Sequence, residues 1–328
     1  MNSLLFFGLL AAIALASDLQ LETSFNSFIK EYRRQYADES EKNYRFSQFT
    51  ANMKIIEEHN AKQTSYVLGI TPFTDLSNEE FAARFVLNTA IANKAKSLSS
   101  EKEVEGSLSM DSHGLPHGID WVSSGKVTSV KNQKSCGACW AFSAVGAIES
   151  AIAINGGDLV DLSVQYLVDC DYSDAGCQGG LMSSAYEFIM EDGLPLWNDY
   201  PYVARQGNCK KVPLKTSILG YYDVPAGNSR ELIKALTKNP VSVAIEADSS
   251  VFQNYKSGVL TDDGCGHSLN HGVLAVGYEL DASTPYYIVK NSWGSSWGEN
   301  GYIRLGITNS YYGTCGIHLM PSYPFVDL

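Results

Sequence analysis

A cysteine thiol stands where a loop gives way to a helical pattern, and this setting favours nucleophilic chemistry. Cys139 begins the segment CWAFSAVGAIESAIAI, in which apolar residues fall at 141, 142, 145, 148 and 152, the spacing of one helical face. The unpaired N–H groups and the positive dipole at a helix start lower the pKa of a thiol below its usual value of about 8.5. We therefore expect Cys139 to be the reactive group of the chain.

The pair Cys136-x-x-Cys139 also fits a redox dithiol or half of a zinc site. A redox pair is disfavoured because the chain has five further cysteines and a leader typical of secretion, a context of structural disulfides. For zinc, the nearest candidates of the right type are Cys265, His267 and His271, but there is no second Cys-x-x-Cys and no usual spacing of a histidine pair. We expect neither a metal nor a cofactor.

Two polar residues far along the chain could complete a nucleophilic site with Cys139. His271 lies in the segment LNHGVLAVGY and Asn291 in KNSWGSSWG, about 130 and 150 residues after the cysteine. A lone histidine or asparagine is more often structural, but together with Cys139 they supply the nucleophile, base and orienting group of covalent acyl transfer. The signature and its spacing resemble those of the papain and cathepsin cysteine proteases.

This resemblance extends from Thr23 to Phe325 and implies an α+β, papain-like, two-lobed fold, a helical lobe plus a β-barrel-like lobe, preceded by a helical propeptide. The sequence pattern agrees with that order. Helical segments follow Cys139 at 162–169 and 181–190, and short runs rich in Val, Ile and Tyr follow at 241–245, 273–278, 286–289 and 302–305. The site would lie in the cleft between the lobes.

The resemblance implies a role for each catalytic residue. His271 would accept the proton of the Cys139 thiol, and the side-chain oxygen of Asn291 would hold the second ring N–H of His271. Gln133 would donate a side-chain N–H to the oxyanion of the tetrahedral intermediate, beside the backbone N–H of Cys139. The alternative for Gln133 is an ordinary residue of a surface loop.

The resemblance also implies a substrate site for a cysteine endopeptidase. Gly180 would bond the backbone of the second residue before the cut. Five apolar residues match the positions that line the pocket for that residue's side chain: Leu181, Met182, Ala244, Leu269 and Met320. Because Met320 stands where an acidic residue would favour arginine, we expect an apolar preference there. No inserted loop with paired histidines blocks the cleft, which favours an endopeptidase over a dipeptidase.

Six paired cysteines allow fifteen connectivities by sequence alone. The resemblance selects Cys136 with Cys177, Cys170 with Cys209, and Cys265 with Cys315, and leaves Cys139 free.

The chain divides into three predicted parts. Residues 1–16 are typical of a signal peptide, because an apolar run too short to span a bilayer precedes Ala14-Leu15-Ala16. Residues 17–114 would be an inhibitory propeptide, helical over about 23–87, with a polar, extended linker at 88–114 that runs along the active-site cleft. Residues 115–328 would be the mature peptidase.

The propeptide prediction depends on two motifs. Six residues share one helical face at steps of three and four: Glu41, Arg45, Phe49, Asn52, Ile56 and Asn60. Two asparagines on that stripe do not suit an ordinary amphipathic helix, and the pattern resembles the long helix of cathepsin L-type propeptides. A second motif of that family corresponds to GITPFTD at 69–75, with Thr71 in place of asparagine.

Composition bounds the partners and the destination. The chain is 45% hydrophobic, 18% charged and carries a net charge of −12, so nucleic acid and anionic membranes are poor partners. We expect a monomer that acts on protein and peptide substrates and is inhibited by its own propeptide and by cystatin-like proteins. Its destination would be the secretory pathway, ending in a lysosome, an acidic vacuole or the extracellular space.

The alternative function belongs to another class: a catalytically inactive homologue that binds or stores. Such homologues usually lose the cysteine. Here Gln133, Cys139, His271 and Asn291 are all present.

Overall fold

The computed structural model describes the chain except residues 1–18, 63, 87, 99–113, 262–263 and 328. The predicted signal peptide therefore lies outside the described residues. Within the described ranges, no helix combines the length and the apolar character needed to cross a membrane.

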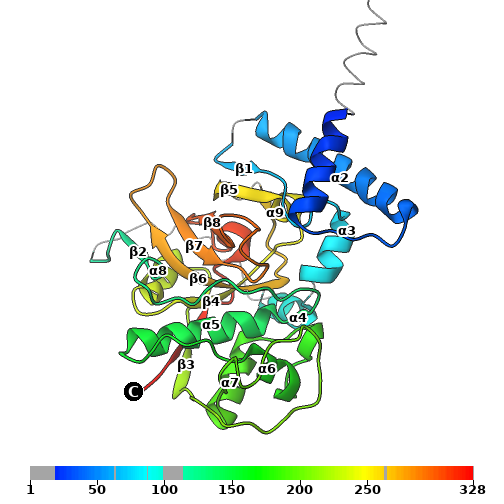
Figure 1. Ribbon diagram of the computed structural model, residues 1–328. Coiled ribbons are helices and arrows are strands. Elements are labelled where there is room, and N and C mark those ends of the chain that lie inside the picture. The colour runs from blue at the N-terminus through cyan, green and yellow to red at the C-terminus, as the bar shows by residue number, and fades with distance from the viewer. Residues whose placement is uncertain (1–18, 63, 87, 99–113, 262–263, 328) are drawn as a thin grey trace, which may run out of the picture.

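The N-terminal part is built on two helices, over residues 19–31 and Glu39–Asn60 (α2), drawn in blue in Figure 1. The side chain of Asp38 caps α2 by accepting a hydrogen bond from the backbone N–H of Glu41 at 2.9 Å. Arg45, Phe49, Asn52 and Ile56 are buried on one face of α2, which confirms the central four residues of the predicted stripe, whereas Glu41 is half-buried and Asn60 is exposed.

The polar residues of that stripe are buried because they bind backbone and acidic groups. The amide of Asn52 donates to the carbonyls of Thr74 and Leu76, each at 2.9 Å. The guanidinium of Arg45 donates to Glu80 at 2.7 Å. Each hydrogen bond satisfies a group that would otherwise be costly to bury. The stripe thus fastens the GITPFTD segment onto α2.

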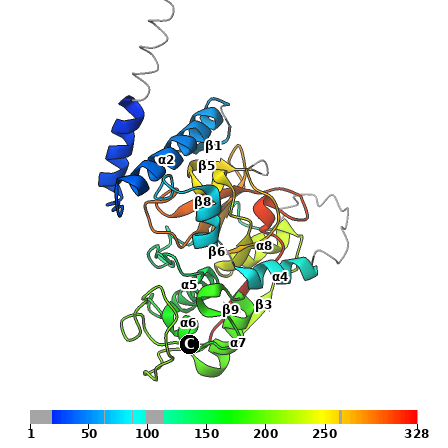
Figure 2. The same cartoon turned by 90° about the vertical axis from the view of Figure 1, so that its right-hand side faces the viewer.

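From there the chain passes through a short helix, α3 (Asn78–Phe81), and a π-helical turn, η1 (Ala82–Val86), into α4 (Thr89–Leu98). The expectation of an extended linker is wrong for residues 89–98, which are helical. This segment contains three alanines and two lysines, which are good helix formers, and Asn88 accepts a hydrogen bond from the backbone N–H of Ile91 at 3.1 Å. In Figure 2 this cyan segment descends over the β lobe to the top of the helical lobe.

The helical lobe consists of α5 (Cys139–Ile154), α6 (Val164–Cys170) and α7 (Met182–Asp192), shown in green in Figure 1. These agree with the three helices predicted from the sequence. Almost every residue of α5 is buried, because α5 packs against α6 and α7 on one side and the sheet on the other. At Gly146 an added Cβ would lie 3.0 Å from the side chain of Leu274, so α5 approaches the sheet closely there.

The other lobe is an antiparallel sheet with one parallel pair, β5 with β8. The described strands lie in the order β1-β5-β8-β7-β6-β4-β9-β3, and β2 pairs with β6. Their bounds are Tyr66–Leu68 (β1), Gly118–Asp120 (β2), Gly220–Asp223 (β3), Val241–Ile245 (β4), Tyr255–Leu260 (β5), His271–Glu279 (β6), Tyr286–Lys290 (β7), Tyr302–Gly306 (β8) and Ser322–Phe325 (β9). Helices α8 (Ser229–Leu236) and α9 (Ser250–Gln253), and single 3₁₀ turns at Gly176–Gln178 (η2) and Thr314–Gly316 (η4), complete the described elements.

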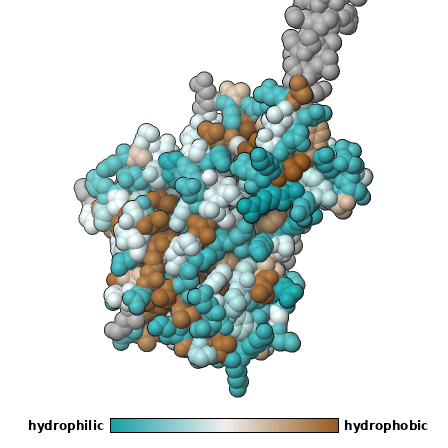
Figure 3. Space-filling model, in the orientation of Figure 1, coloured by the Kyte–Doolittle hydropathy of each residue, from teal (hydrophilic) through white to brown (hydrophobic). Residues whose placement is uncertain are grey.

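Strand β1 belongs to the N-terminal part, yet it pairs antiparallel with β5, with Tyr66 opposite Gly258. The N-terminal part therefore extends the sheet of the lobe that it covers, and Phe73 and Phe81 join the same hydrophobic core. On the face shown in Figure 3, hydrophobic residues gather in patches between hydrophilic ones.

Candidate active site

Cys139 is the first residue of α5 and is buried, with 1% of its surface exposed. It is the one free cysteine, because the other six form the pairs Cys136–Cys177, Cys170–Cys209 and Cys265–Cys315. Those pairs are the ones that the resemblance selects.

The electrostatic setting of the thiol differs from the sequence expectation. Burial raises the pKa of Cys139, and hydrogen bonds from the backbone N–H of Gly272, the side chain of Asn88 and the first turn of α5 only partly offset it. The expectation of a lowered pKa is therefore wrong for this closed state, because covering the helix start outweighs its dipole. The thiol is held neutral.

His271 and Asn291 form a hydrogen-bonded pair on the opposite wall. His271 begins β6, Asn291 follows the last residue of β7, and the two side chains meet with Nε2 of His271 2.9 Å from Oδ1 of Asn291. Oδ1 can only accept, so Nε2 carries the proton. Nδ1 of His271 is buried and has no hydrogen-bond partner among the described residues. That nitrogen is therefore left with a lone pair available as a base.

Burial also sets the charge of the imidazole. It lowers the pKa of His271 to about 4, although the hydrogen bond to Asn291 acts in the other direction. The adjacent Gly272 donates its backbone N–H to the Cys139 sulfur, so β6 runs directly beside the thiol. In this state the site contains a neutral thiol and a neutral imidazole.

The indole of Trp293 covers the His271–Asn291 pair. Its ring stacks on the imidazole with centroids 4.7 Å apart and planes at 28°. Phe73 and Phe81 from the N-terminal part meet the same indole edge-on, at 5.5 and 5.3 Å. The hydrogen bond to Asn291 is thereby kept away from water, which strengthens it.

Gln133 is buried, so the alternative of a surface loop residue is wrong. Its Oε1 accepts a hydrogen bond from the hydroxyl of Ser292 at 2.6 Å, which fixes the amide orientation. Its Nε2 donates to the carbonyl of Cys136 and to the carbonyl of Phe85, both at 3.2 Å. The carbonyl of Phe85, in the N-terminal part, thus accepts a hydrogen bond from the same Gln133 N–H group that was predicted to bind the oxyanion.

Asn88 was missed by sequence reasoning and lies at the centre of the site. Its Nδ2 donates to the carbonyl of Gly180 at 2.9 Å and contacts the sulfur of Cys139 at 3.6 Å. An added Cβ on Gly179 would come within 2.5 Å of Oδ1 of Asn88, so only glycine allows this approach. The sequence offered no signal for this contact, since Asn88 stands at the start of the predicted linker and belongs to none of the motifs.

The predicted pocket residues gather in one cluster. Met182, Ala244 and Leu269 are buried, and Leu181 and Met320 pack partly buried against the same core. Ile91 of α4 is a fully buried member of this cluster. At Gly180 an added Cβ would lie 2.6 Å from the ring of Trp140, so this position must remain glycine for the loop to pack. The five apolar residues predicted to line the pocket therefore belong to one hydrophobic core, and Gly180 packs against Trp140 of the same core.

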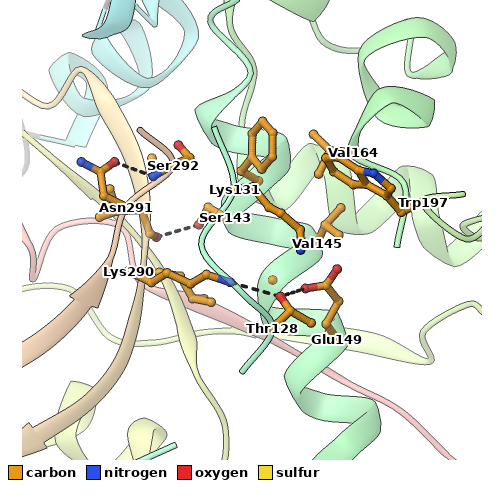
Figure 4. A pocket seen from close by; sticks show the side chains of 15 residues that line it. Thr128, Lys131, Ser143, Val145, Glu149, Val164, Trp197, Lys290, Asn291 and Ser292 are labelled. Carbon is orange, nitrogen blue, oxygen red and sulfur yellow. Dashed lines mark hydrogen bonds between the residues drawn. The ribbon is translucent and has the colours of Figure 1, made fainter. Parts of the chain in front are cut away.

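Behind the site, a buried charge network joins the two lobes (Figure 4). Nζ of Lys290, at the end of β7, donates to the hydroxyl of Thr128 at 3.1 Å, and that hydroxyl donates to Glu149 of α5 at 2.6 Å. The second oxygen of Glu149 accepts from the backbone N–H of Leu162 at 2.8 Å. Lys290, Thr128 and Glu149 line a cavity of about 30 Å³ that also touches Asn291. The network holds the end of β7, directly before Asn291, against the helix bearing Cys139.

Among the described residues, no group of three or more His, Cys, Asp or Glu side chains could hold a metal ion. The fold and the site together define a precursor in which an N-terminal domain fills the cleft of a thiol-dependent enzyme.

Comparison with known proteins agrees with this assignment. Residues 115–325 match the papain family cysteine protease model, and residues 25–81 match the cathepsin propeptide inhibitor domain. The chain belongs to the papain family of cysteine proteases and is a cathepsin L-like zymogen with its propeptide.

Relatives and solved structures resemble the chain over most of its length. It is 42% identical to the probable cysteine protease RDL2 of Arabidopsis thaliana, over 94% of this chain and 86% of that protein. The recombinant stem bromelain precursor is 41% identical, with a TM-score of 0.84, over 94% of this chain and 100% of that structure. Digestive procathepsin L 3 of Tenebrio molitor larval midgut is 36% identical, with a TM-score of 0.79, over 93% and 99%.

Proposed function

We propose that the mature chain is an endopeptidase that uses Cys139 as nucleophile, His271 as base and Asn291 as the group that orients His271. One observation carries this proposal. A free thiol at the start of α5 lies beside the strand of an imidazole whose Nε2 proton is held by Asn291, leaving Nδ1 without a partner among the described residues. The Cys139 thiolate and the His271 imidazolium form only after the propeptide leaves and water reaches the site, because burial disfavours both charged forms.

In the proposed reaction, His271 takes the proton of the thiol and the sulfur attacks the carbonyl carbon of the peptide bond. The tetrahedral intermediate collapses as the C–N bond breaks, and the imidazolium gives its proton to the leaving amine. Water, deprotonated by the same imidazole, then hydrolyses the thioester and restores the thiol. Asn291 stabilises the imidazolium because its Oδ1 accepts a hydrogen bond from the Nε2–H of His271.

The proposed oxyanion donors are Nε2 of Gln133 and the backbone N–H of Cys139. The hydrogen bond from Gln133 to the carbonyl of Phe85 supports this role, because it aims the amide at a carbonyl oxygen within the cleft. Loss of one such donor typically lowers kcat roughly 100- to 1000-fold. We expect a loss of that size in the Gln133→Ala enzyme.

The test compares the acid-processed wild-type protein with Cys139→Ala on a fluorogenic peptide, with and without a thiol-alkylating agent. Wild type should hydrolyse the peptide and lose activity on alkylation, whereas Cys139→Ala should be inactive. Alanine is tolerated at a helix start, so the variant should remain folded. Residual turnover within tenfold of wild type would overturn the assignment of the nucleophile. A folded wild type without activity would support the binding or storage alternative.

We also propose the finer specificity of this site. Gly180 binds the backbone of the second residue before the cut, and Leu181, Met182, Ala244, Leu269 and Met320 give its side chain an apolar lining. The burial of Ile91 in the same cluster supports a preference for apolar side chains.

The processing and location are proposed on the sequence pattern. Residues 1–16 direct the chain to the secretory pathway, residues 17–114 are removed, and 115–328 remain as a monomeric enzyme. Three disulfides suit that pathway. The destination is a lysosome, an acidic vacuole or the extracellular space, where cystatin-like proteins would inhibit the enzyme.

A further inference from the structure

The proposed specificity pocket does not end at Met320. A cavity of about 360 Å³ opens there, and Met182, Leu319 and Met320 form its apolar wall. The acidic residues Glu187 and Asp223 also line this cavity. The apolar part of the pocket therefore continues into a part with negative charge.

The two carboxylates come from separate elements that converge at this cavity. Glu187 lies on the exposed face of α7, and Asp223 is the last residue of β3. The hydroxyl of Tyr221 donates to Glu187 at 2.9 Å and so orients its carboxylate. Burial and the charge of Glu187 both raise the pKa of Asp223. Two like charges facing one cavity favour a cation between them.

The precursor already places a cation there. Lys94 of α4 is the one basic residue among the described residues that line the cavity, and its charge acts on Asp223 to lower its pKa. Ile91 and Lys94 lie three residues apart on one face of α4, and Asn88 directly precedes this helix. Along this segment, Asn88 meets the thiol, Ile91 fills the apolar cluster and Lys94 meets the acidic end. Removal of the propeptide removes all three.

We propose that the mature enzyme uses this acidic end to accept arginine or lysine at the second residue before the cut. The aliphatic stem would lie along Met182 and Met320, and the charged group would lie between Glu187 and Asp223. Long basic side chains commonly pack their stems on apolar surface and keep their charge in a polar environment.

This inference rests on the proposed function and refines its specificity. From Met320 alone, the sequence predicts an apolar preference, because a charge buried in an apolar pocket would find no partner. The open cavity removes that obstacle. An apolar side chain would use only the inner part of the pocket, and a basic one would use both parts.

The experiment isolates charge from size. Two fluorogenic peptides, identical except for arginine or its neutral isostere citrulline at the second residue before the cut, are compared on the processed enzyme. The readout is the kcat/KM of the arginine peptide divided by that of the citrulline peptide. The wild-type ratio should exceed one and fall as salt is raised, since exposed charge pairs are screened. Asp223→Asn and Glu187→Gln should each lower the ratio roughly two- to fivefold.

Glu191→Gln is the matched control, because Glu191 is an exposed acid of α7 that is not among the residues lining the cavity. It changes the net charge equally and should leave the ratio unchanged. A wild-type ratio of one, or a ratio unaffected by both Asp223→Asn and Glu187→Gln, would overturn the inference.

A third peptide, with leucine at the same position, separates the two proposals. If the leucine peptide is hydrolysed but the arginine-to-citrulline ratio does not change with salt or with the substitutions, only the proposed role of the acidic end is refuted. Absence of all hydrolysis refutes the proposed function itself.

Discussion

Replacing Lys290 with methionine should destabilise the precursor strongly, because it leaves the carboxylate of Glu149 buried without its countercharge. Lys290 and Glu149 are 8% and 4% exposed and communicate through the hydroxyl of Thr128. Burial already raises the pKa of Glu149, and the charge of Lys290 is the main influence that lowers it. Breaking a buried ion pair from one side costs about 3–5 kcal/mol.

That cost is a large share of a typical stability of about 5–15 kcal/mol. With a shift of about 2–4 °C per kcal/mol for a protein of this size class, the melting temperature should fall by roughly 6–20 °C. The assay is thermal unfolding followed by circular dichroism, in a Cys139→Ala background that prevents self-digestion. The loss should be largest at neutral pH. It should shrink in acid, because a carboxyl with a raised folded-state pKa is relieved of its burial cost as it takes up a proton.

The double substitution Lys290→Met with Glu149→Gln is the control. It removes both charges, keeps a group that can bond Thr128 and Leu162, and should recover most of the lost stability. The reasoning would be refuted if Lys290→Met alone lowered the stability by less than about 1 kcal/mol, which is below the range for a broken buried pair. It would also be refuted if the double variant were no more stable than Lys290→Met.

Three further predictions concern the closed cleft. The pKa of His271 is about 4 in the precursor, where the propeptide covers it, and 6.5 ordinarily. Between these two pH values the imidazole takes up a proton when the cleft is open but not when it is closed. Acidification from pH 6.5 to 4 should therefore disfavour the closed precursor by up to about 3 kcal/mol. Self-processing rates measured across that range should rise steeply, and a flat profile would contradict the account. Iodoacetamide should label Cys139 at pH 7 at least about 100-fold more slowly in the precursor than in the processed enzyme, since burial raises the pKa of its thiol; equal rates, read by mass spectrometry, would show an accessible thiolate. Asn88→Ala should raise the residual activity of the precursor at pH 7 about tenfold by removing its bond to Gly180. Asn93→Ala, which replaces an exposed asparagine in the adjoining helix α4, should not.

The elements that carry the site could be predicted because their signals are local. The period of apolar residues after Cys139 predicts α5, and the steps of three and four from Glu41 to Asn60 predict the buried face of α2. The β runs are bounded by residues that break strands, so β4 was placed at its observed limits and β6 to β8 within two residues of theirs.

What could not be predicted depends on contacts between distant segments. Residues 88–114 taken together have a polar composition that suggests a linker, but docking of Ile91 in the cleft stabilises residues 89–98 as a helix. The predicted direction of the Cys139 pKa shift was wrong. A helix start indicates only the local electric field at the thiol, whereas the burial of the thiol depends on the propeptide that covers it. The pairing of Lys290 with Glu149 likewise has no signature, since any two charged residues look alike in sequence.

The strand pairing of β1 with β5 has a consequence for activation kinetics. While the propeptide is covalently attached, β1 meets β5, and α4 meets the cleft, at an effective concentration of about millimolar, which is typical of a tethered partner. A cut between α4 and β2 leaves every one of these contacts in place and changes only that concentration. Activation therefore has two stages, scission and then escape of the severed segment. The extent of this escape depends on dilution, so a larger fraction of the activity should appear in a dilute sample than in a concentrated one that has been cut to the same extent.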